Sequence, residues 1–202
     1  MPSSGRELQK TSTSLKQRIP ALLIAARILL GPLLFGLVLT NQGPALILAA
    51  LIAAMLSDIF DGVIARRMKI ATERLRVADS YTDAWFFVWV GAAIWRAVPQ
   101  LVEDYRLPLL TELALQLASY AYDLVRYRRI SSLHAYSAKL WAITLFIAAG
   151  SLLAFHYGPP IWLTFAFGLV SFFDALAIKL ILPGWHHDVL SAVHAWRQKN
   201  PA

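Results

Sequence analysis

Six apolar stretches, each close to the length of a membrane-spanning helix, constrain the fold of this 202-residue chain. A helix needs about 20 mostly apolar residues to cross the hydrocarbon core of a bilayer. The stretches cover residues 19–40, 44–65, 79–98, 107–125, 138–155 and 159–182. Glycine and proline mark the breaks between them, as at Gly43 and Pro44. Because 58% of the residues are hydrophobic and only 15% are charged, we predict an all-α integral membrane protein with six transmembrane helices.

Two terminal segments flank the predicted six-helix membrane domain, which extends over residues 19–182. Residues 1–18 are predicted to form a cytoplasmic N-terminal segment, either a short amphipathic helix at the membrane interface or a solvated tail. Residues 183–202 are predicted to form a cytoplasmic C-terminal tail, with the same two alternatives for its mixture of aromatic, histidine and apolar residues. The first apolar stretch is too long for a cleaved signal peptide, so we expect it to remain as a span.

Lysine and arginine gather on one side of the predicted spans. They lie before the first stretch, between the second and third, and between the fourth and fifth, whereas the opposite side carries Arg96 and Arg106. Cytoplasmic loops are enriched in positive charge, so both termini are predicted to face the cytosol. The net charge of +7 comes from basic residues that lie in groups between the apolar runs and do not form one long tract. This pattern favours anionic membrane lipids over nucleic acid as the partner.

Four aspartates, Asp58, Asp61, Asp79 and Asp83, lie at the cytosolic ends of the second and third stretches. Carboxylates beside a membrane are costly, so function is the default explanation for them. If both stretches are helical, spacings of three and four residues place each pair on one face of its helix. Carboxylate oxygens suit hard cations such as Mg²⁺ and Mn²⁺, and the chain has no cysteine to supply thiolates. We therefore predict a divalent-metal site facing the cytosol.

The segment from Ser57 to Trp85 resembles the signature of the CDP-alcohol phosphotransferase (phosphatidyltransferase) family, in which DxxDGxxAR precedes a glycine and two aspartates at fixed spacing. Seven of the eight specified positions match: Asp58, Asp61, Gly62, Ala65, Arg66, Asp79 and Asp83. At the remaining position, Leu75 replaces the family's second glycine. Residues 19–32 also resemble the family's first span, and Ser137–Leu140 is similar to the lysine-bearing start of its fifth span.

This resemblance implies an enzyme that transfers a phosphatidyl group from CDP-diacylglycerol to a small alcohol or polyol phosphate and releases CMP. The family's smaller bacterial members make phospholipids, which implies a bacterial cytoplasmic membrane. Among the acceptors we favour glycerol 3-phosphate, because the predicted inner face is basic. The family is often dimeric through its membrane helices, so the resemblance is also compatible with a homodimer.

The resemblance further implies roles for individual residues. The four aspartates would hold Mg²⁺ or Mn²⁺, as two ions, and Asp83 would be the general base that takes the proton of the acceptor hydroxyl. Contacts with the nucleotide and donor would involve Gly62, Ala65, Arg66 and Leu75, and the acceptor phosphate would meet Lys139, Arg126 and Arg27. Ordinary helix packing through small residues and positive-inside topology remain alternative explanations for several of these residues. For Arg27, extension of the side chain to the interface is the alternative.

Two functions from other classes stay open. In a catalytically silent relative that binds lipid or metal, Leu75 would block entry of the nucleotide. A cation transporter would use the same aspartates, but we expect a transporter to carry its carboxylates near the bilayer midplane, whereas these lie at one edge.

Charged residues in the later stretches are expected to have structural roles. For Asp174 and Lys179 we predict an ion pair, with each other or with Arg27. Asp123 is a candidate for orienting the basic group, and Glu112 is expected at the interface.

Overall fold

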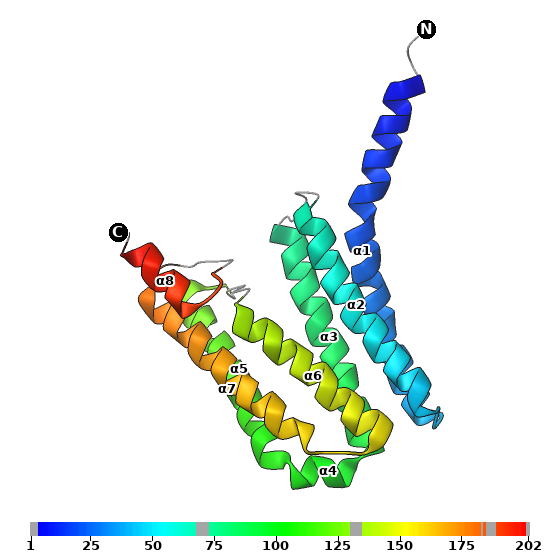
Figure 1. The fold of residues 1–202 in the computed structure, drawn as a ribbon, viewed down its shortest axis with the longest axis vertical. Helices are drawn as coiled ribbons and strands as arrows, with labels where there is room; N and C mark the ends of the chain where they lie inside the picture. Colours follow the sequence, from blue (N-terminus) through cyan, green and yellow to red (C-terminus); the bar gives the residue numbers. More distant parts are fainter. Residues whose placement is uncertain (1–3, 68–72, 130–134, 183, 185–188, 201–202) are drawn as a thin grey trace. The chain divides into compact units, whose positions relative to one another are not determined.

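The computed structural model describes residues 4–67, 73–129, 135–182, 184 and 189–200; within these ranges, it leaves out the side chains of residues 4–21, 61, 65–67 and 73–77. The described residues contain no β-strand, so the prediction of an all-α fold is confirmed for them. The helices, shown in Figure 1, are α1 (Ser4–Leu39), α2 (Pro44–Arg67), α3 (Glu73–Ala97), α4 (Pro99–Asp104), α5 (Arg106–Tyr127), α6 (Tyr136–Phe155), α7 (Pro160–Ile181) and α8 (Ala192–Lys199).

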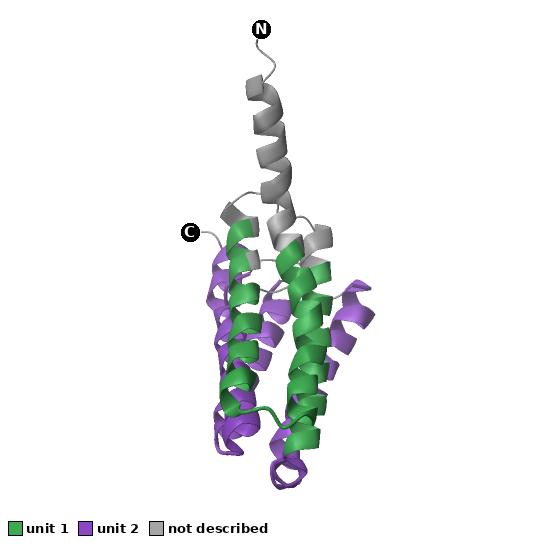
Figure 2. Ribbon diagram, turned by 90° about the vertical axis from the view of Figure 1, so that its right-hand side faces the viewer, with its two compact units in different colours: residues 1–97 green, residues 98–202 purple. Residues whose placement is uncertain are grey.

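The helices fall into two compact units, residues 1–97 and 98–202, which Figure 2 shows in different colours. In the first unit, α1 packs against both α2 and α3. Its core includes Leu34 from α1, Ala54 from α2 and Phe86 from α3, each at most 1% exposed. A Cβ atom at Gly31 of α1 would approach Trp89 of α3 to 2.9 Å, so the absence of a side chain there lets the two helices pack closely.

In the second unit, α7 packs against α5, α6 and α8. A buried cluster joins residues of α7 and α8 with residues beside the helix ends: Ala135, Ile178, Leu182, Val189 and Ala195. Glu112 of α5 accepts a hydrogen bond from the Trp141 indole of α6, and Gly168 of α7 leaves the room for this contact. Glu112, which the sequence suggested to be interfacial, therefore has a partner inside the helix bundle.

The Lys179 ammonium forms a buried ion pair with Asp123 of α5, with 2.8 Å between Nζ and Oδ1. The same ammonium donates to the Ser119 hydroxyl at 2.8 Å. Asp174 instead accepts hydrogen bonds from Ser137 and from the backbone of Ala192. The expectation of an ion pair for Lys179 holds, but its partner is neither Asp174 nor Arg27.

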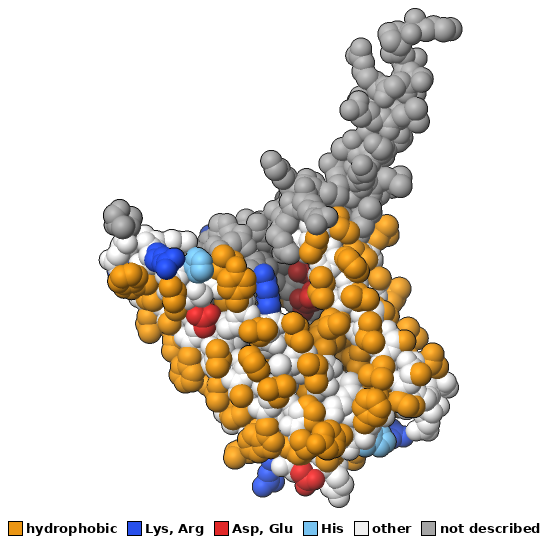
Figure 3. All heavy atoms as spheres, in the orientation of Figure 1, with side chains coloured by type: hydrophobic (Ala, Val, Ile, Leu, Met, Phe, Trp, Pro, Cys, Tyr) orange, Lys and Arg blue, Asp and Glu red, His pale blue; other side chains and the backbone are white. Residues whose placement is uncertain are grey.

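Four of the described helices are long and apolar enough to cross a membrane: residues 22–39 of α1, 44–64 of α2, 136–155 of α6 and 160–181 of α7. The two other predicted spans correspond to α3 and α5, which are less apolar than α2, α6 and α7, so six transmembrane helices are not confirmed. Figure 3 shows hydrophobic side chains over most of the face in view. Large apolar residues are exposed on α3 and α5 as well, for example Val88 and Leu107, which suits a lipid environment.

Helices occur near both ends of the chain. The part of the N-terminal segment that the structure describes continues into the first span as α1, and α8 lies within the predicted C-terminal tail. On α8, Val193 and Trp196 are exposed, and Arg197 and Lys199 lie in the last turn. The division into a terminal segment, a membrane domain and a tail stays a prediction.

Candidate functional site

Three of the predicted aspartates lie together in the first unit. Asp58 comes from α2, whereas Asp79 and Asp83 are one turn apart on α3. One carboxylate oxygen from each lies within 4.8 Å of the other two. The spacing of four residues on α3 directs two carboxylates to the same side, and the packing of α2 and α3 on α1 brings the third to them. We call Asp58, Asp79 and Asp83 the aspartate cluster.

Arg27 of α1 lies within the aspartate cluster and is only 1% exposed. Its Nη1 atom is 3.1 Å from Asp58 Oδ1 and 3.0 Å from Asp79 Oδ1, and it also contacts Asp83 Oδ1. A guanidinium buried between membrane helices needs nearby negative charge, which the cluster supplies. Arg27 is therefore the residue of α1 that links the acidic groups of α2 and α3.

Ser57 is a neighbour of the cluster that sequence reasoning did not identify. Its buried hydroxyl accepts a hydrogen bond from Arg27 Nε at 3.4 Å and donates to the Ala54 carbonyl at 2.8 Å. The contact orients the plane of the guanidinium while Nη1 faces the carboxylates. The position of Ser57 directly before Asp58 of the signature could have drawn attention to it. The sequence alone did not indicate that Arg27 would be its partner.

The aspartate cluster has the chemistry of a divalent-metal site. The exposed fractions of its side chains are 38% for Asp58, 29% for Asp79 and 39% for Asp83, so solvent reaches all three. Mg²⁺ and Mn²⁺ prefer hard oxygen ligands, and Mg²⁺ keeps several waters, which a partly open carboxylate group permits. The residues present fit such an ion, with Arg27 as the neighbouring positive charge.

A family model described as CDP-alcohol phosphatidyltransferase matches residues 17–178, which include the cluster, Arg27 and helices from both units. The chain belongs to the CDP-alcohol phosphatidyltransferase family. No curated protein and no solved structure gives a significant match. Members of the family transfer a phosphatidyl group from a CDP-alcohol to an acceptor and generally depend on divalent metal ions. The protein is accordingly a membrane transferase of phospholipid biosynthesis.

The other signature residues of this CDP-alcohol phosphatidyltransferase lie along α2 and α3. Gly62 follows Asp58 by about one turn on α2. The side chains of the remaining predicted site residues in this segment, Asp61, Ala65, Arg66 and Leu75, lie outside the described part of the structure. Their roles, like those of the cluster residues, stay predictions.

The second unit holds the other two basic residues predicted for the acceptor site. Arg126 lies in the last turn of α5 and Lys139 in the first turn of α6, and both are exposed. The Lys139 ammonium lies 5.5 Å from the centre of the Tyr136 ring, a cation–π contact that restricts the lysine side chain. Both cations therefore remain accessible to an anionic ligand.

Arg27→Gln is expected to tighten Mn²⁺ binding by about tenfold, because a positive charge leaves the neighbourhood of the metal ligands. Without metal, the variant should unfold at a lower temperature than the wild type, since three close carboxylates lose their counter-charge. Added Mn²⁺ should then raise its Tm by more than it raises that of the wild type. Mn²⁺ titration followed by electron paramagnetic resonance, together with thermal unfolding in detergent, measures both effects.

Arg96→Gln is the matched control for this prediction, because Arg96 is an exposed arginine in the last turn of α3. It should leave Mn²⁺ affinity unchanged. Weaker Mn²⁺ binding by Arg27→Gln than by the wild type would contradict the electrostatic explanation.

Proposed function

We propose that the protein transfers the phosphatidyl group of CDP-diacylglycerol to glycerol 3-phosphate and releases CMP, using Mg²⁺ or Mn²⁺ held by Asp58, Asp61, Asp79 and Asp83. The observation that carries the proposal is the convergence of Asp58, Asp79 and Asp83 within 4.8 Å, inside a chain matched by the family model. Two such ions, held by these aspartates, would supply charge neutralisation for the displacement.

The reaction requires a deprotonated acceptor hydroxyl and a stabilised leaving group. Asp83 accepts the proton of the acceptor hydroxyl, and its partial exposure allows this contact. The hydroxyl oxygen forms a bond to the phosphorus that carries diacylglycerol. The bond from that phosphorus to the bridging oxygen breaks, and CMP leaves with the electron pair. When bound, the divalent ions supply charge neutralisation at the diphosphate.

On the donor side, the proposal assigns the cytidine diphosphate to the signature segment. Gly62 and Ala65 lack bulk and leave room for the nucleotide to approach α2. Arg66 donates to a phosphate through its planar guanidinium. Leu75 stands where the family's glycine would give the nucleotide space, so its side chain borders the cytidine.

On the acceptor side, the phosphate of glycerol 3-phosphate binds to basic side chains. Lys139 and Arg126 are exposed and carry the positive charge that a phosphomonoester requires. Arg27, the third basic residue of the proposal, contacts Asp58 and Asp79 of the aspartate cluster in this structure. The basic side chains are the reason for proposing a phosphorylated acceptor.

We infer from the distribution of lysine and arginine between the apolar stretches that the site faces the cytosol. The bacterial cytoplasmic membrane is proposed from the resemblance to the smaller bacterial members of the family. The protein there meets CDP-diacylglycerol within the lipid bilayer and the acceptor in the cytosol. A homodimer through membrane helices is compatible with this arrangement.

The test is CMP release by purified protein given CDP-diacylglycerol, Mn²⁺ or Mg²⁺ and a panel of acceptors: glycerol 3-phosphate, serine, inositol and inositol phosphate. The proposal predicts release with glycerol 3-phosphate above the other acceptors. Faster release with a different acceptor would overturn the choice of substrate, and no release with any acceptor would overturn the proposed activity.

Leu75→Gly distinguishes an active enzyme from a catalytically silent relative. If the wild type is active, the glycine should change the KM for CDP-diacylglycerol while the KM for the acceptor stays the same, because position 75 borders the nucleotide. The kinetic constants of CMP release measure this difference. Activity that appears only in the Leu75→Gly variant would instead favour the silent relative.

A further inference from the structure

Asp174 of α7 joins three helices of the second unit through one carboxylate. Its Oδ2 atom accepts a hydrogen bond from the Ser137 hydroxyl at 2.7 Å, and Oδ1 accepts one from the Ala192 backbone N–H at 2.8 Å. Ser137 lies in the first turn of α6, and Ala192 is the first residue of α8. Hydrogen bonds to a charged acceptor are stronger than those between neutral groups. The Asp174 carboxylate therefore fixes the first turn of α6 and the first residue of α8 against α7.

Further contacts attach the C-terminal segment, residues 189–199, to the same turn of α6. The Tyr136 backbone N–H donates to the Leu190 carbonyl at 3.1 Å. Val189 and Ala195 of the segment also belong to the same buried cluster as Ala135. The C-terminal segment is thus packed against the start of α6.

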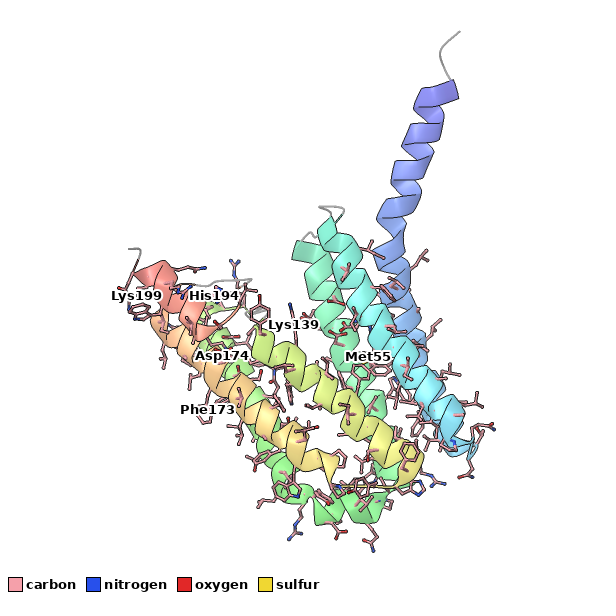
Figure 4. All side chains as sticks on the ribbon, viewed as in Figure 1. Met55, Lys139, Phe173, Asp174, His194 and Lys199 are labelled. Atoms are coloured by element: carbon pink, nitrogen blue, oxygen red, sulfur yellow. The ribbon has the colours of Figure 1, made fainter. Side chains whose placement is uncertain are left out.

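Lys139 lies on the turn that these contacts fix. It follows Ser137 by two residues, and its ammonium is held near the ring of Tyr136. Figure 4 labels Lys139 on α6 and Asp174 on α7, in the part of the second unit where α8 packs. A displacement of the first turn of α6 would therefore move the Lys139 ammonium directly.

We propose that Asp174 is a positioning residue for the phosphorylated acceptor. By fixing the first turn of α6 against the C-terminal segment, it sets the position from which Lys139 binds a phosphomonoester. This inference rests on the proposed function, in which Lys139 contacts the acceptor phosphate. It makes the C-terminal segment a structural part of the acceptor site.

Kinetics of the 202-residue protein test the proposal, with Asp174→Asn and Ser137→Ala as variants. Both should raise the KM for glycerol 3-phosphate by about three- to tenfold, the range for one lost hydrogen bond, and leave kcat and the KM for CDP-diacylglycerol within about twofold. Ser151→Ala is the matched control, since this α6 hydroxyl donates at 2.7 Å to the Tyr157 carbonyl, beyond the other end of the helix. An equal rise of KM in the control, or equal rises for donor and acceptor, would overturn the proposal.

A double-mutant cycle with Lys139→Met tests whether Asp174 acts through Lys139. In that background Asp174→Asn should add no further increase in the KM for glycerol 3-phosphate, because the group that it positions is absent. Independent, multiplying effects would contradict a positioning role. A loss of folding alone would not produce the expected dependence on Lys139.

Hydrogen exchange measured by mass spectrometry and direct binding of glycerol 3-phosphate give readouts that need no turnover. In Asp174→Asn, amides of residues 136–140 and 189–199 should exchange faster than in the wild type, and glycerol 3-phosphate should bind more weakly. Unchanged exchange in both segments, or unchanged binding, would overturn the proposal. If the wild type binds glycerol 3-phosphate but releases no CMP, the proposed activity fails, while these two measurements still decide the role of Asp174.

Discussion

Asp83→Asn is expected to lower the rate of CMP release by about 10²- to 10⁴-fold, the usual contribution of a general base. An asparagine keeps the shape of the side chain and one oxygen, but it does not accept the proton of the acceptor hydroxyl at neutral pH. Mn²⁺ should still bind, because Asp58 and Asp79 keep their carboxylates beside the substituted position. Rates of CMP release and Mn²⁺ titration on the same preparation measure the two properties separately.

Two further variants serve as the comparison and the control for Asp83→Asn. Asp58→Asn removes a predicted metal ligand without removing the base, so it should weaken Mn²⁺ binding and lower activity together. Asp104→Asn changes an exposed acid at the end of α4 and should alter neither property. Near-normal turnover by Asp83→Asn would exclude Asp83 as the base.

Lys179→Met is expected to destabilise the protein by about 3–5 kcal/mol, because it leaves the buried Asp123 carboxylate without the ammonium that it contacts at 2.8 Å. Both side chains are at most 5% exposed, so water does not replace the lost partner. Thermal unfolding of the purified protein in detergent should show a clearly lower Tm. Lys199→Met, at the exposed end of α8, is the matched control and should leave Tm unchanged.

The double variant Lys179→Met/Asp123→Leu should recover much of the lost stability, since an apolar pair often replaces a buried ion pair at little cost. Recovery would show that the damage comes from the loss of the ammonium beside the Asp123 carboxylate. If the double variant is as unstable as Lys179→Met, the contact with Ser119 or the local packing matters more than the ion pair.

The aspartate cluster was predictable from the sequence in part. The spacing of Asp79 and Asp83 places them on one side of any helix, and the signature joins them to Asp58. The contact with Arg27 was not predictable, because it depends on how α1 packs between α2 and α3. An arginine within an apolar stretch indicated that negative charge had to be near, but several acids were available.

The partner of Lys179 shows why long-range pairing escaped prediction. Asp174 is close in sequence, but five residues along a helix turn the side chain by about 140° from Lys179, so the two point in different directions. Asp123 belongs to another helix, and only the packing of α5 on α7 brings it near. The same packing leaves Asp174 free to bind the starts of α6 and α8.

Six spans were predicted from apolar stretches, and four of them correspond to helices that are long and apolar enough to cross a membrane. The stretches in α2 and α7 qualify although each carries two charged residues, because the rest of each stretch is strongly apolar. In α3 and α5 the charged residues, among them Asp79, Asp83 and Asp123, are accompanied by further polar residues, such as Thr82 and Gln116. The overall polarity of each stretch, and not its acids alone, therefore decides whether the hydropathy criterion identifies it as a span.

The dependence of CMP release on free Mn²⁺, measured with metal-depleted protein, CDP-diacylglycerol and glycerol 3-phosphate, tests the central claim most directly. We predict no release without a divalent ion, recovery as Mn²⁺ is added, and a need for higher Mn²⁺ concentrations in Asp58→Asn. Release that persists without any divalent ion, or that responds identically in the wild type and Asp58→Asn, would contradict a metal-assisted transfer at the aspartate cluster.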